Sequence, residues 1–251
     1  MVMIRSEKEG LTSDTLLQGR VQLLQPSSGL RAGLDAVLLA ASIPAQPGET
    51  VLEAGCGSGA VFLCLLARIP SLRIVAVERV AALAELARRN AVINGVADRV
   101  TVIEGDVTQL DELRHLAVQH ACANPPYWPT GTRPPEALRS QATHTESAGD
   151  LKAWATAMAR PLAHRASMTF ILPTTRYLDG ADALRAAHCF GVEVMPLWPR
   201  PGSVSKRVLL QARRFSHAPD RVHQGLILHD GSGWSAAAAK LLDRGEALSW
   251  G

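Results

Sequence analysis

Residues 50–59 read TVLEAGCGSG, a short apolar run that leads into three glycines, each separated by one residue. The segment 58–69 that follows has apolar residues at the spacing of a helix face. Glycine permits positive φ and a close approach of the backbone to a ligand, and a helix start offers unpaired N–H groups. The stretch therefore predicts a strand, a glycine turn and a helix, with a ligand held at the turn.

Strands and helices continue to alternate after this turn. We expect further strands at 73–77, 100–103, 117–123, 167–172, 192–197 and 207–213, and helices at 81–94, 151–162 and 182–189. This order predicts an α/β fold, a Rossmann-like and mostly parallel sheet of seven strands with helices on both faces. Ligands bind such sheets at the carboxyl ends of the strands, where Gly55, Glu78, Asp106 and Asn124 fall.

Two segments lie outside this alternating core. Residues 16–24 have a hairpin-like pattern around Gly19 and Arg20, and 35–42 form a short apolar helix. The tail contains a short strand with a turn and a terminal helix, at 226–233 and 235–242. We expect one domain, with an N-terminal extension at 1–48, a central core at 49–214 and a C-terminal tail at 215–251.

Composition limits the class of protein. The chain has 251 residues, enough for one α/β domain, and 47% of them are hydrophobic. Its four cysteines form no CxxC pair and no Cys/His cluster with zinc spacing, which predicts a reduced, cytoplasmic protein without a metal. We find no signal peptide and no apolar run of 18 residues, so we expect no membrane association. We expect a monomer.

An acidic residue accompanies the glycine turn at two places. Read with Ala60, the glycines also fit the dinucleotide-binding pattern, and Glu78 lies 23 residues after Gly55, where an acid accepts hydrogen bonds from ribose hydroxyls. These features alone favour an NAD enzyme and a methyltransferase equally. Glu53 adds a further feature, because it precedes Gly55 by two residues.

The pattern Glu53-x-Gly55-x-Gly57-x-Gly59 resembles the first motif of class I S-adenosylmethionine-dependent methyltransferases. The resemblance implies that S-adenosylmethionine is the cofactor and that Glu53 helps to place its amino-acid end. It also implies that Glu78 binds the ribose, and that Asp106, with the backbone of Val107, holds the adenine. The simpler alternatives are a surface acid at a strand end for Glu78 and a helix N-cap for Asp106.

The tetrapeptide Asn124-Pro125-Pro126-Tyr127 directly follows the strand expected at 117–123. The lone pair of an exocyclic amino nitrogen is delocalised into its ring, so two acceptors aimed at its N–H groups would activate it. Asn124 supplies a side-chain carbonyl and Pro125 a backbone carbonyl, and Pro126 biases Pro125 to an extended conformation. Tyr127 can stack on a flat base. The alternative is a turn that closes a strand.

This motif resembles that of adenine-N6 and glutamine-N5 methyltransferases, and it does not separate them. Upstream, Gln25-Pro26 and the sequence RAGLD at 31–35 resemble the N-terminal signature of bacterial methyltransferases that act on tRNA(Val). Those enzymes modify N6 of the adenosine next to the anticodon. The resemblance covers residues 16–212 and implies that Arg31 and Asp35 lie close to the cofactor, the alternative being a turn and an N-cap.

Two observations bear on the substrate. Only about 49 residues precede the first core strand, whereas the glutamine methyltransferases carry a separate N-terminal helical domain. We therefore expect RNA, with a protein glutamine or a cofactor-binding module without catalysis as alternatives; the Pro-Pro motif disfavours a dehydrogenase. Trp128 and the basic residues Lys206, Arg207, Arg213 and Arg214 are expected to contact RNA near the open edge of the site. A solvated face is the alternative for the basic segment.

Overall fold

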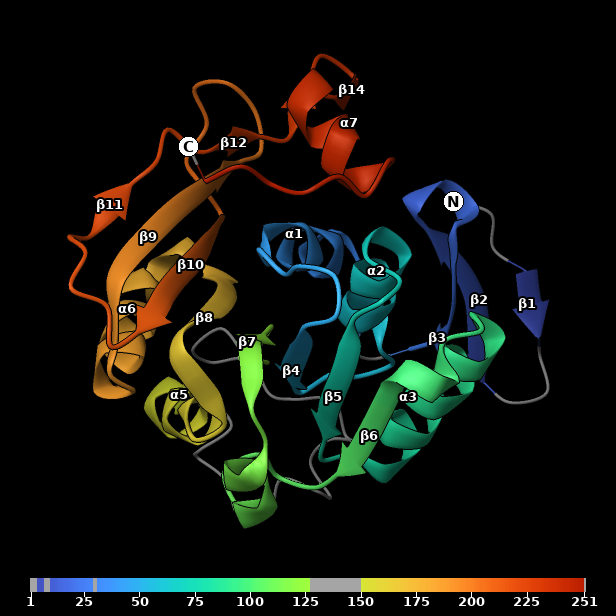
Figure 1. Cartoon of the computed structure of the whole chain (residues 1–251). Helices are drawn as coiled ribbons and strands as arrows, with labels where there is room; N and C mark the ends of the chain where they lie inside the picture. Colours follow the sequence, from blue (N-terminus) through green and yellow to red (C-terminus); the bar gives the residue numbers. More distant parts are fainter. Residues whose placement is uncertain (1–3, 7–9, 29–30, 127–149, 251) are drawn as a thin grey trace.

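A computed structural model describes residues 4–6, 10–28, 31–126 and 150–250 of the chain. Tyr127 and Trp128 lie outside these ranges, so the structure does not place the two predicted base contacts. The order of elements begins with an N-terminal sheet and one helix, continues through the alternating core, and ends in a tail that returns to the first helix (Figure 1).

The main sheet contains the seven predicted strands. They are β4 (Thr50–Ala54), β5 (Arg73–Glu78), β6 (Val100–Glu104), β7 (Val118–Ala123), β8 (Leu162–Pro173), β9 (Cys189–Trp198) and β10 (Arg207–Arg214). Their order across the sheet is β6-β5-β4-β7-β8-β10-β9, with β10 antiparallel to both neighbours (Figure 1). Two short strands of the tail pair with β9: β11 (Arg221–Val222), which the sequence did not indicate, and β12 (Leu226–Ile227), which lies in the expected strand and turn at 226–233. The predicted Rossmann-like fold is confirmed.

Helices cover both faces of this sheet, as expected. One layer holds α1 (Leu34–Ser42), α2 (Ala60–Arg68) and α3 (Ala81–Ile93), and the other holds α5 (Leu151–Ala159) and α6 (Tyr177–Ala186) (Figure 1). A hydrophobic core lies between the sheet and each helix layer. Because side chains alternate along a strand, Ile74 and Ala76 of β5 face the core on the side of α2, whereas Val77 faces the core on the side of α5. Short 3-10 helices occur at Leu17–Gly19, Ala97–Arg99, Asp111–His115 and Thr174–Arg176.

The N-terminal extension forms a sheet of its own. The predicted hairpin is β2 (Leu11–Leu16) and β3 (Val21–Pro26), to which β1 (Ile4–Ser6) adds a third strand. The free edge of β3 is paired by side chains of α3. Asn90 exchanges two hydrogen bonds of 2.9 Å with the backbone of Leu24, and Asn94 bonds the backbone of Gln22 in the same way. The two amides therefore replace a neighbouring strand.

The C-terminal tail closes over the first helix. A small hairpin of β13 (His229–Asp230) and β14 (Gly233–Trp234) leads into α7 (Ala236–Leu242), which packs on α1. Beyond α7, the indole of Trp250 donates to the carbonyl of Ser42 at 3.0 Å. No helix within the described ranges is both long enough and apolar enough to cross a membrane.

Candidate active site

The predicted site residues meet at one edge of the main sheet. Ala54, the last residue of β4, pairs with Val77 of β5 on one side and with Ala123 of β7 on the other. Glu78 pairs in turn with Glu104, the last residue of β6. The glycine turn, Glu78, Asp106 and Asn124 therefore follow four adjacent strand ends, the position that the sequence predicts.

The glycine turn is built on positive φ angles, which are 68° at Gly55, 56° at Gly57 and 93° at Gly59. An L side chain rarely adopts this conformation, so glycine is required at these positions. Hydrogen bonds from the backbone N–H groups of Gly55 and Cys56 to the carbonyl of Val77, at 2.8 and 3.0 Å, hold the start of the turn on β5. The turn ends where α2 begins, at Ala60.

Glu78 closes the turn from the neighbouring strand. Its carboxylate accepts from the backbone N–H of Gly57 at 2.8 Å and of Val80 at 2.9 Å. A carboxylate offers about four acceptor positions, so these two bonds leave capacity for a pair of hydroxyl donors. Glu78 is buried, which argues against the alternative of an ordinary surface acid.

Glu53 lies beneath the turn, on the last part of β4. It is buried, and its carboxylate accepts from the backbone N–H of Phe62 at 3.0 Å. Burial raises the pKa of Glu53 from 4.5 to about 8; the hydrogen bond from Phe62 opposes this and the charge of Glu78 adds to it. A carboxyl group in this state would bind a cationic group well, because the cation would compensate its buried charge.

Asp106 follows β6 and caps its own loop. Its Oδ1 accepts from the backbone N–H of Thr108 at 2.9 Å and from the Thr108 hydroxyl at 2.7 Å. This geometry is an Asx turn, related to the N-cap alternative raised from the sequence, and it leaves Oδ2 outside these two bonds. Val107 is buried beside it, which fixes the backbone of the loop.

Asn124, Pro125 and Pro126 directly follow β7. Asn124 and Pro126 are half-buried and Pro125 is buried, so this end of the strand is fixed by its surroundings. The strand beneath is fully enclosed at Ala121, Cys122 and Ala123. Burial raises the pKa of the Cys122 thiol, and that of the Cys56 thiol in the turn, well above the ordinary value. Neither thiol is a nucleophile at neutral pH.

Trp154 of α5 is a site residue that sequence reasoning missed. A Cβ added at Gly55 would lie only 2.8 Å from Cη2 of the Trp154 indole, so the glycine turn rests directly against this ring. The sequence placed Trp154 on a helix but gave no signal that this helix returns to the turn. The contact adds a steric requirement for glycine at Gly55 beyond its positive φ.

The two N-terminal residues that the resemblance assigned to the cofactor contact other groups. Arg31 donates to the hydroxyl of Thr12 at 2.8 Å and forms an ion pair of 2.5 Å with the buried Asp14 on β2. Asp35, in the first turn of α1, forms an ion pair of 2.8 Å with Arg207 of β10. These bonds tie the hairpin, α1 and β10 together at the carboxyl edge of the sheet.

The basic segment divides between the two ends of β10. Arg207 pairs with Pro173 and therefore lies at the carboxyl edge, next to the exposed Lys206. Arg213 pairs with Ser167 and lies at the opposite edge, followed by Arg214. The expectation that all four residues gather near the open edge of the site is wrong for Arg213 and Arg214, because β10 runs across the whole sheet.

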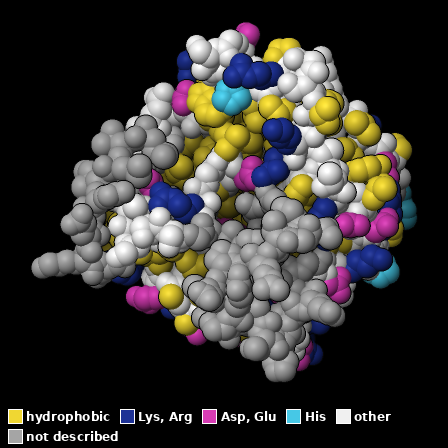
Figure 2. All heavy atoms as spheres, turned by 180° about the vertical axis from the view of Figure 1, so that it is seen from behind, with side chains coloured by type: hydrophobic (Ala, Val, Ile, Leu, Met, Phe, Trp, Pro, Cys, Tyr) yellow, Lys and Arg dark blue, Asp and Glu magenta, His cyan; other side chains and the backbone are white. Residues whose placement is uncertain are grey.

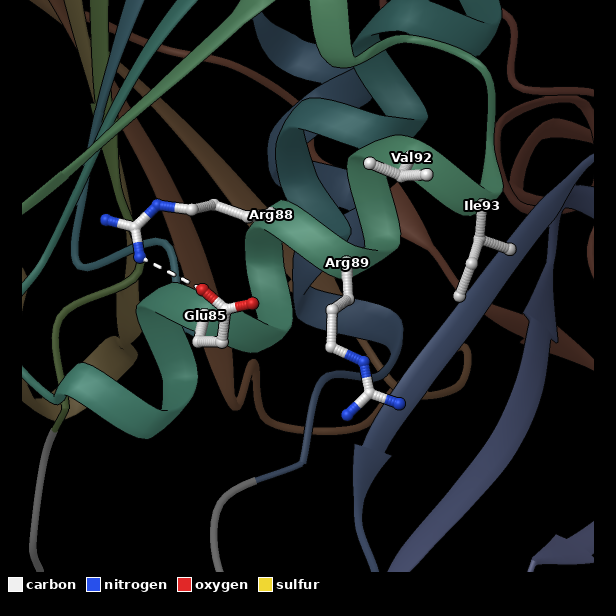
Figure 3. A pocket seen from close by; sticks show the side chains of 5 residues that line it. All are labelled: Glu85, Arg88, Arg89, Val92 and Ile93. Carbon is white, nitrogen blue, oxygen red and sulfur yellow. Dashed lines mark hydrogen bonds and ion pairs between the residues drawn. The ribbon is translucent and has the colours of Figure 1, made fainter.

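A shallow hollow lies on the outer surface of α3. Its lining is Glu85, Arg88, Arg89, Val92 and Ile93, with an ion pair of 3.3 Å between Glu85 and Arg88 (Figure 3). None of these residues belongs to the predicted site. Within the described ranges, no group of three or more His, Cys, Asp and Glu residues could hold a metal ion.

Comparison with known proteins identifies the family of this chain. Residues 51–149 match a family model described as a methyltransferase domain. The chain is 30% identical over 210 residues to the tRNA1(Val) (adenine(37)-N6)-methyltransferase of Aeromonas hydrophila, covering 81% of this chain and 84% of that one. This chain belongs to the tRNA1(Val) (adenine(37)-N6)-methyltransferase family.

Other relatives agree with this family. A tRNA1(Val) (adenine(37)-N6)-methyltransferase from Porphyromonas gingivalis is 28% identical over 227 residues, covering 86% of this chain and 88% of that one. Among solved structures, a predicted O-methyltransferase from Agrobacterium tumefaciens superposes with a TM-score of 0.72 at 23% identity, over 85% of this chain and 98% of that one. The chain is thus a methyltransferase with S-adenosylmethionine as its cofactor, and the NAD alternative is excluded.

Asn90 offers a test of how the N-terminal sheet supports the site. It is fully buried and, besides pairing Leu24, donates to the carbonyl of Ser58 in the glycine turn at 2.8 Å. Asn94 forms the same kind of hydrogen bonds with β3, but it makes none with the glycine turn. We expect Asn90→Ala and Asn94→Ala each to lower the free energy of unfolding by about 1–3 kcal/mol, because backbone groups lose their partners.

The two variants should differ in cofactor binding, measured by calorimetry with S-adenosylmethionine. Asn90→Ala should raise the dissociation constant on the order of tenfold, equivalent to about 1.4 kcal/mol. Asn94→Ala, the matched control, should leave it nearly unchanged. Equal effects of the two variants on binding would mean that the bond to Ser58 does not hold the turn.

Proposed function

We propose that this chain transfers the methyl group of S-adenosylmethionine to N6 of adenosine 37 in tRNA1(Val). The main support is the position of Asn124 and Pro125, which lie beside the glycine turn at the carboxyl ends of the strands. The relatives of this chain are named for the same activity. The names of those relatives specify a tRNA substrate, which favours RNA over a protein glutamine.

The residues of the turn fit S-adenosylmethionine. Open space lies where a Cβ would be at Gly57, so a ligand can approach the backbone there, and Glu78 retains acceptor capacity for the ribose hydroxyls. Glu53, near the amino-acid end, can compensate an ammonium group. Asp106 and the backbone of Val107 are proposed to hold the adenine. Arg31 and Asp35 take a supporting role through Asp14 and Arg207, since they contact these residues.

The chain itself has to position and polarise the target nitrogen. The bound cofactor supplies an activated methyl group, so no strong general base is required. The carbonyl of the Asn124 side chain and that of the Pro125 backbone are proposed to accept the two N–H groups of adenine N6, drawing its lone pair out of the ring. Holding that nitrogen in line for transfer accounts for most of the rate. Tyr127 and Trp128 are proposed to stack on the base and on its neighbour.

The remaining parts of the chain are proposed to serve this one catalytic domain. The extension at 1–48 holds the glycine turn through Asn90, and the tail at 215–251 fixes α1 through bonds such as that from Trp250 to Ser42. Lys206 and Arg207 lie at the carboxyl edge, where they can meet the phosphates of the substrate. We propose that the enzyme acts as a monomer in the cytoplasm.

A pair of transcripts tests the proposed position. We expect the protein, with methyl-labelled S-adenosylmethionine, to label a tRNA1(Val) transcript with adenosine at position 37. A matched transcript with guanosine at that position should take up no label. Equal labelling of both would contradict the site, and labelling of a protein glutamine without any RNA would contradict the substrate class.

A further inference from the structure

A cluster of exposed aromatic rings and cationic side chains lies at the opposite end of the strands from the active site. Three chain segments meet there: 160–166, 187–191 and 213–218. Together they contain four Arg and three His residues and not one Asp or Glu. We call six of their exposed residues the basic aromatic patch: His164, Arg165, His188, Phe190, Arg213 and Phe215.

The rings of the patch lie against one another. Phe215 is at its centre, with ring centroids 6.1 Å from both His164 and His188, and the His164 ring is tilted by only 27° from it. The guanidinium of Arg214 lies 4.2 Å from the Phe215 centroid. Even so, Phe215 remains 44% exposed and Phe190 remains 38% exposed. A large apolar ring that is this exposed can contact a further planar partner.

The backbone of the patch is strained and bulged. Arg165, His188 and Phe215 have φ of 62°, 55° and 53°, and they are three of the five non-glycine residues with positive φ in the described ranges. The pairing of β7 with β8 shifts between Val118 and His120, so that residues 163–166 form a bulge within β8. Such features cost stability and commonly direct side chains toward a functional surface.

The charge of the patch is directed outward. The Arg213 guanidinium donates to the backbone carbonyl of Arg165 at 3.3 Å, which ties the Arg213 side chain to the segment that carries Arg165. Acidic groups on adjoining segments have their own partners: Asp220 pairs with Arg185 at 2.5 Å, and Asp111 pairs with Arg114 at 2.7 Å and with Arg160 of the first segment at 3.5 Å. A polyanion with flat rings is the chemistry that such a surface complements.

We propose that the basic aromatic patch is a second RNA-contacting surface, which binds the tRNA substrate away from the methylated base. An unpaired base stacks on Phe215, and flanking phosphates meet Arg165 and Arg213. The inference rests on the proposed RNA substrate. His120 of β7 lies level with the patch, and Asn124 of the active site follows four residues later. At ~3.3 Å per residue the patch and the active site are therefore about 13 Å apart along the strand, so one tRNA can reach both.

Binding of a tRNA1(Val) transcript across a salt series tests the proposal. Phe215→Ala should weaken binding roughly 5- to 150-fold, the range for loss of one stacked base, with an unchanged salt slope. Phe215→Tyr should restore affinity and Phe215→Leu should not, because only tyrosine retains the ring. Arg165→Gln and Arg213→Gln should each flatten the log–log salt slope by about 0.7–0.9. Arg221→Gln, an exposed arginine on β11 outside the patch, is the matched control.

All of these variants should bind S-adenosylmethionine as the unchanged protein does, which confirms that the fold and the cofactor site are intact. Unchanged tRNA affinity and salt slope in every patch variant, with methylation of tRNA by the unchanged protein, would overturn the patch and leave the proposed function standing. A change in self-association without a change in RNA binding would also overturn it, in favour of a protein interface. Failure of the unchanged protein to bind any RNA would overturn the proposed function and the patch together.

Discussion

Asn124→Ala is expected to lower kcat for methyl transfer roughly 100- to 1000-fold, the usual effect of removing one oriented hydrogen-bonding group from a reacting centre. The half-buried Asn124 directly follows Ala123, which is fully buried and pairs with Ala54 just before the glycine turn, so its backbone is held beside that turn. The change removes an acceptor for the target amino group but leaves Glu53, Glu78 and the glycines in place. Single-turnover kinetics with saturating cofactor would measure the rate.

The dissociation constant for S-adenosylmethionine should change less than about threefold in the same variant, well under the ~1.4 kcal/mol of a tenfold change. Asn124→Asp is an informative control, since it keeps an acceptor oxygen but replaces the amide with a charge. Near-normal turnover in Asn124→Ala would show that the tetrapeptide only closes the strand. A parallel loss of cofactor binding would assign Asn124 to the cofactor rather than to the substrate.

The affinity for S-adenosylmethionine is expected to rise steeply with pH up to about 8. The pKa of Glu53 in the free protein is about 8, because burial disfavours its charged form. If Glu53 pairs with the ammonium of the cofactor, it must lose its proton on binding, so the dissociation constant should fall about tenfold per pH unit below that value. Above pH 8 the α-amino group of the cofactor itself begins to lose its charge.

The sign for stability is the opposite in the free protein. A carboxyl group whose pKa is raised from 4.5 to about 8 binds its proton more tightly in the folded state. Its contribution to stability is therefore present below pH 4.5 and declines as the pH rises through 8. Glu53→Gln should remove this slope and should bind the cofactor weakly with little pH dependence below 8. Calorimetry at pH 6, 7 and 8 measures both; a flat profile in the unchanged protein would contradict the proposed pairing.

Local sequence patterns predicted the core of this fold well. The strand at Thr50–Ala54 has the predicted bounds, and the four strand ends with their polar residues lie together as expected. The prediction succeeds because a parallel strand that is buried between two helix layers has a continuous apolar sequence. The carboxyl end of each strand then determines where the residues that follow it lie. Chain position alone was enough to place Gly55 and Glu78 at this end of the sheet.

Contacts between distant segments could not be predicted in this way. The helix with Trp154 returns to Gly55, and Asn90 and Asn94 pair the edge of β3, but no spacing in the sequence announces either contact. Arg213 and Arg207, on the strand expected at 207–213, were both expected to contact RNA near the open edge of the site. The structure puts them at opposite edges because eight residues of β10 cross the sheet, and the residues of its far end became part of a second surface.

The central claim is that the methyl group is added to the exocyclic nitrogen of adenine. Its most direct test is mass spectrometry of nucleosides from tRNA1(Val) that has been incubated with the protein and S-adenosylmethionine carrying a deuterated methyl group. The account predicts N6-methyladenosine that carries the label, and none with Asn124→Ala at the same exposure. Label in a ring-methylated or ribose-methylated nucleoside, or no label in any adenosine while the cofactor is bound, would contradict it.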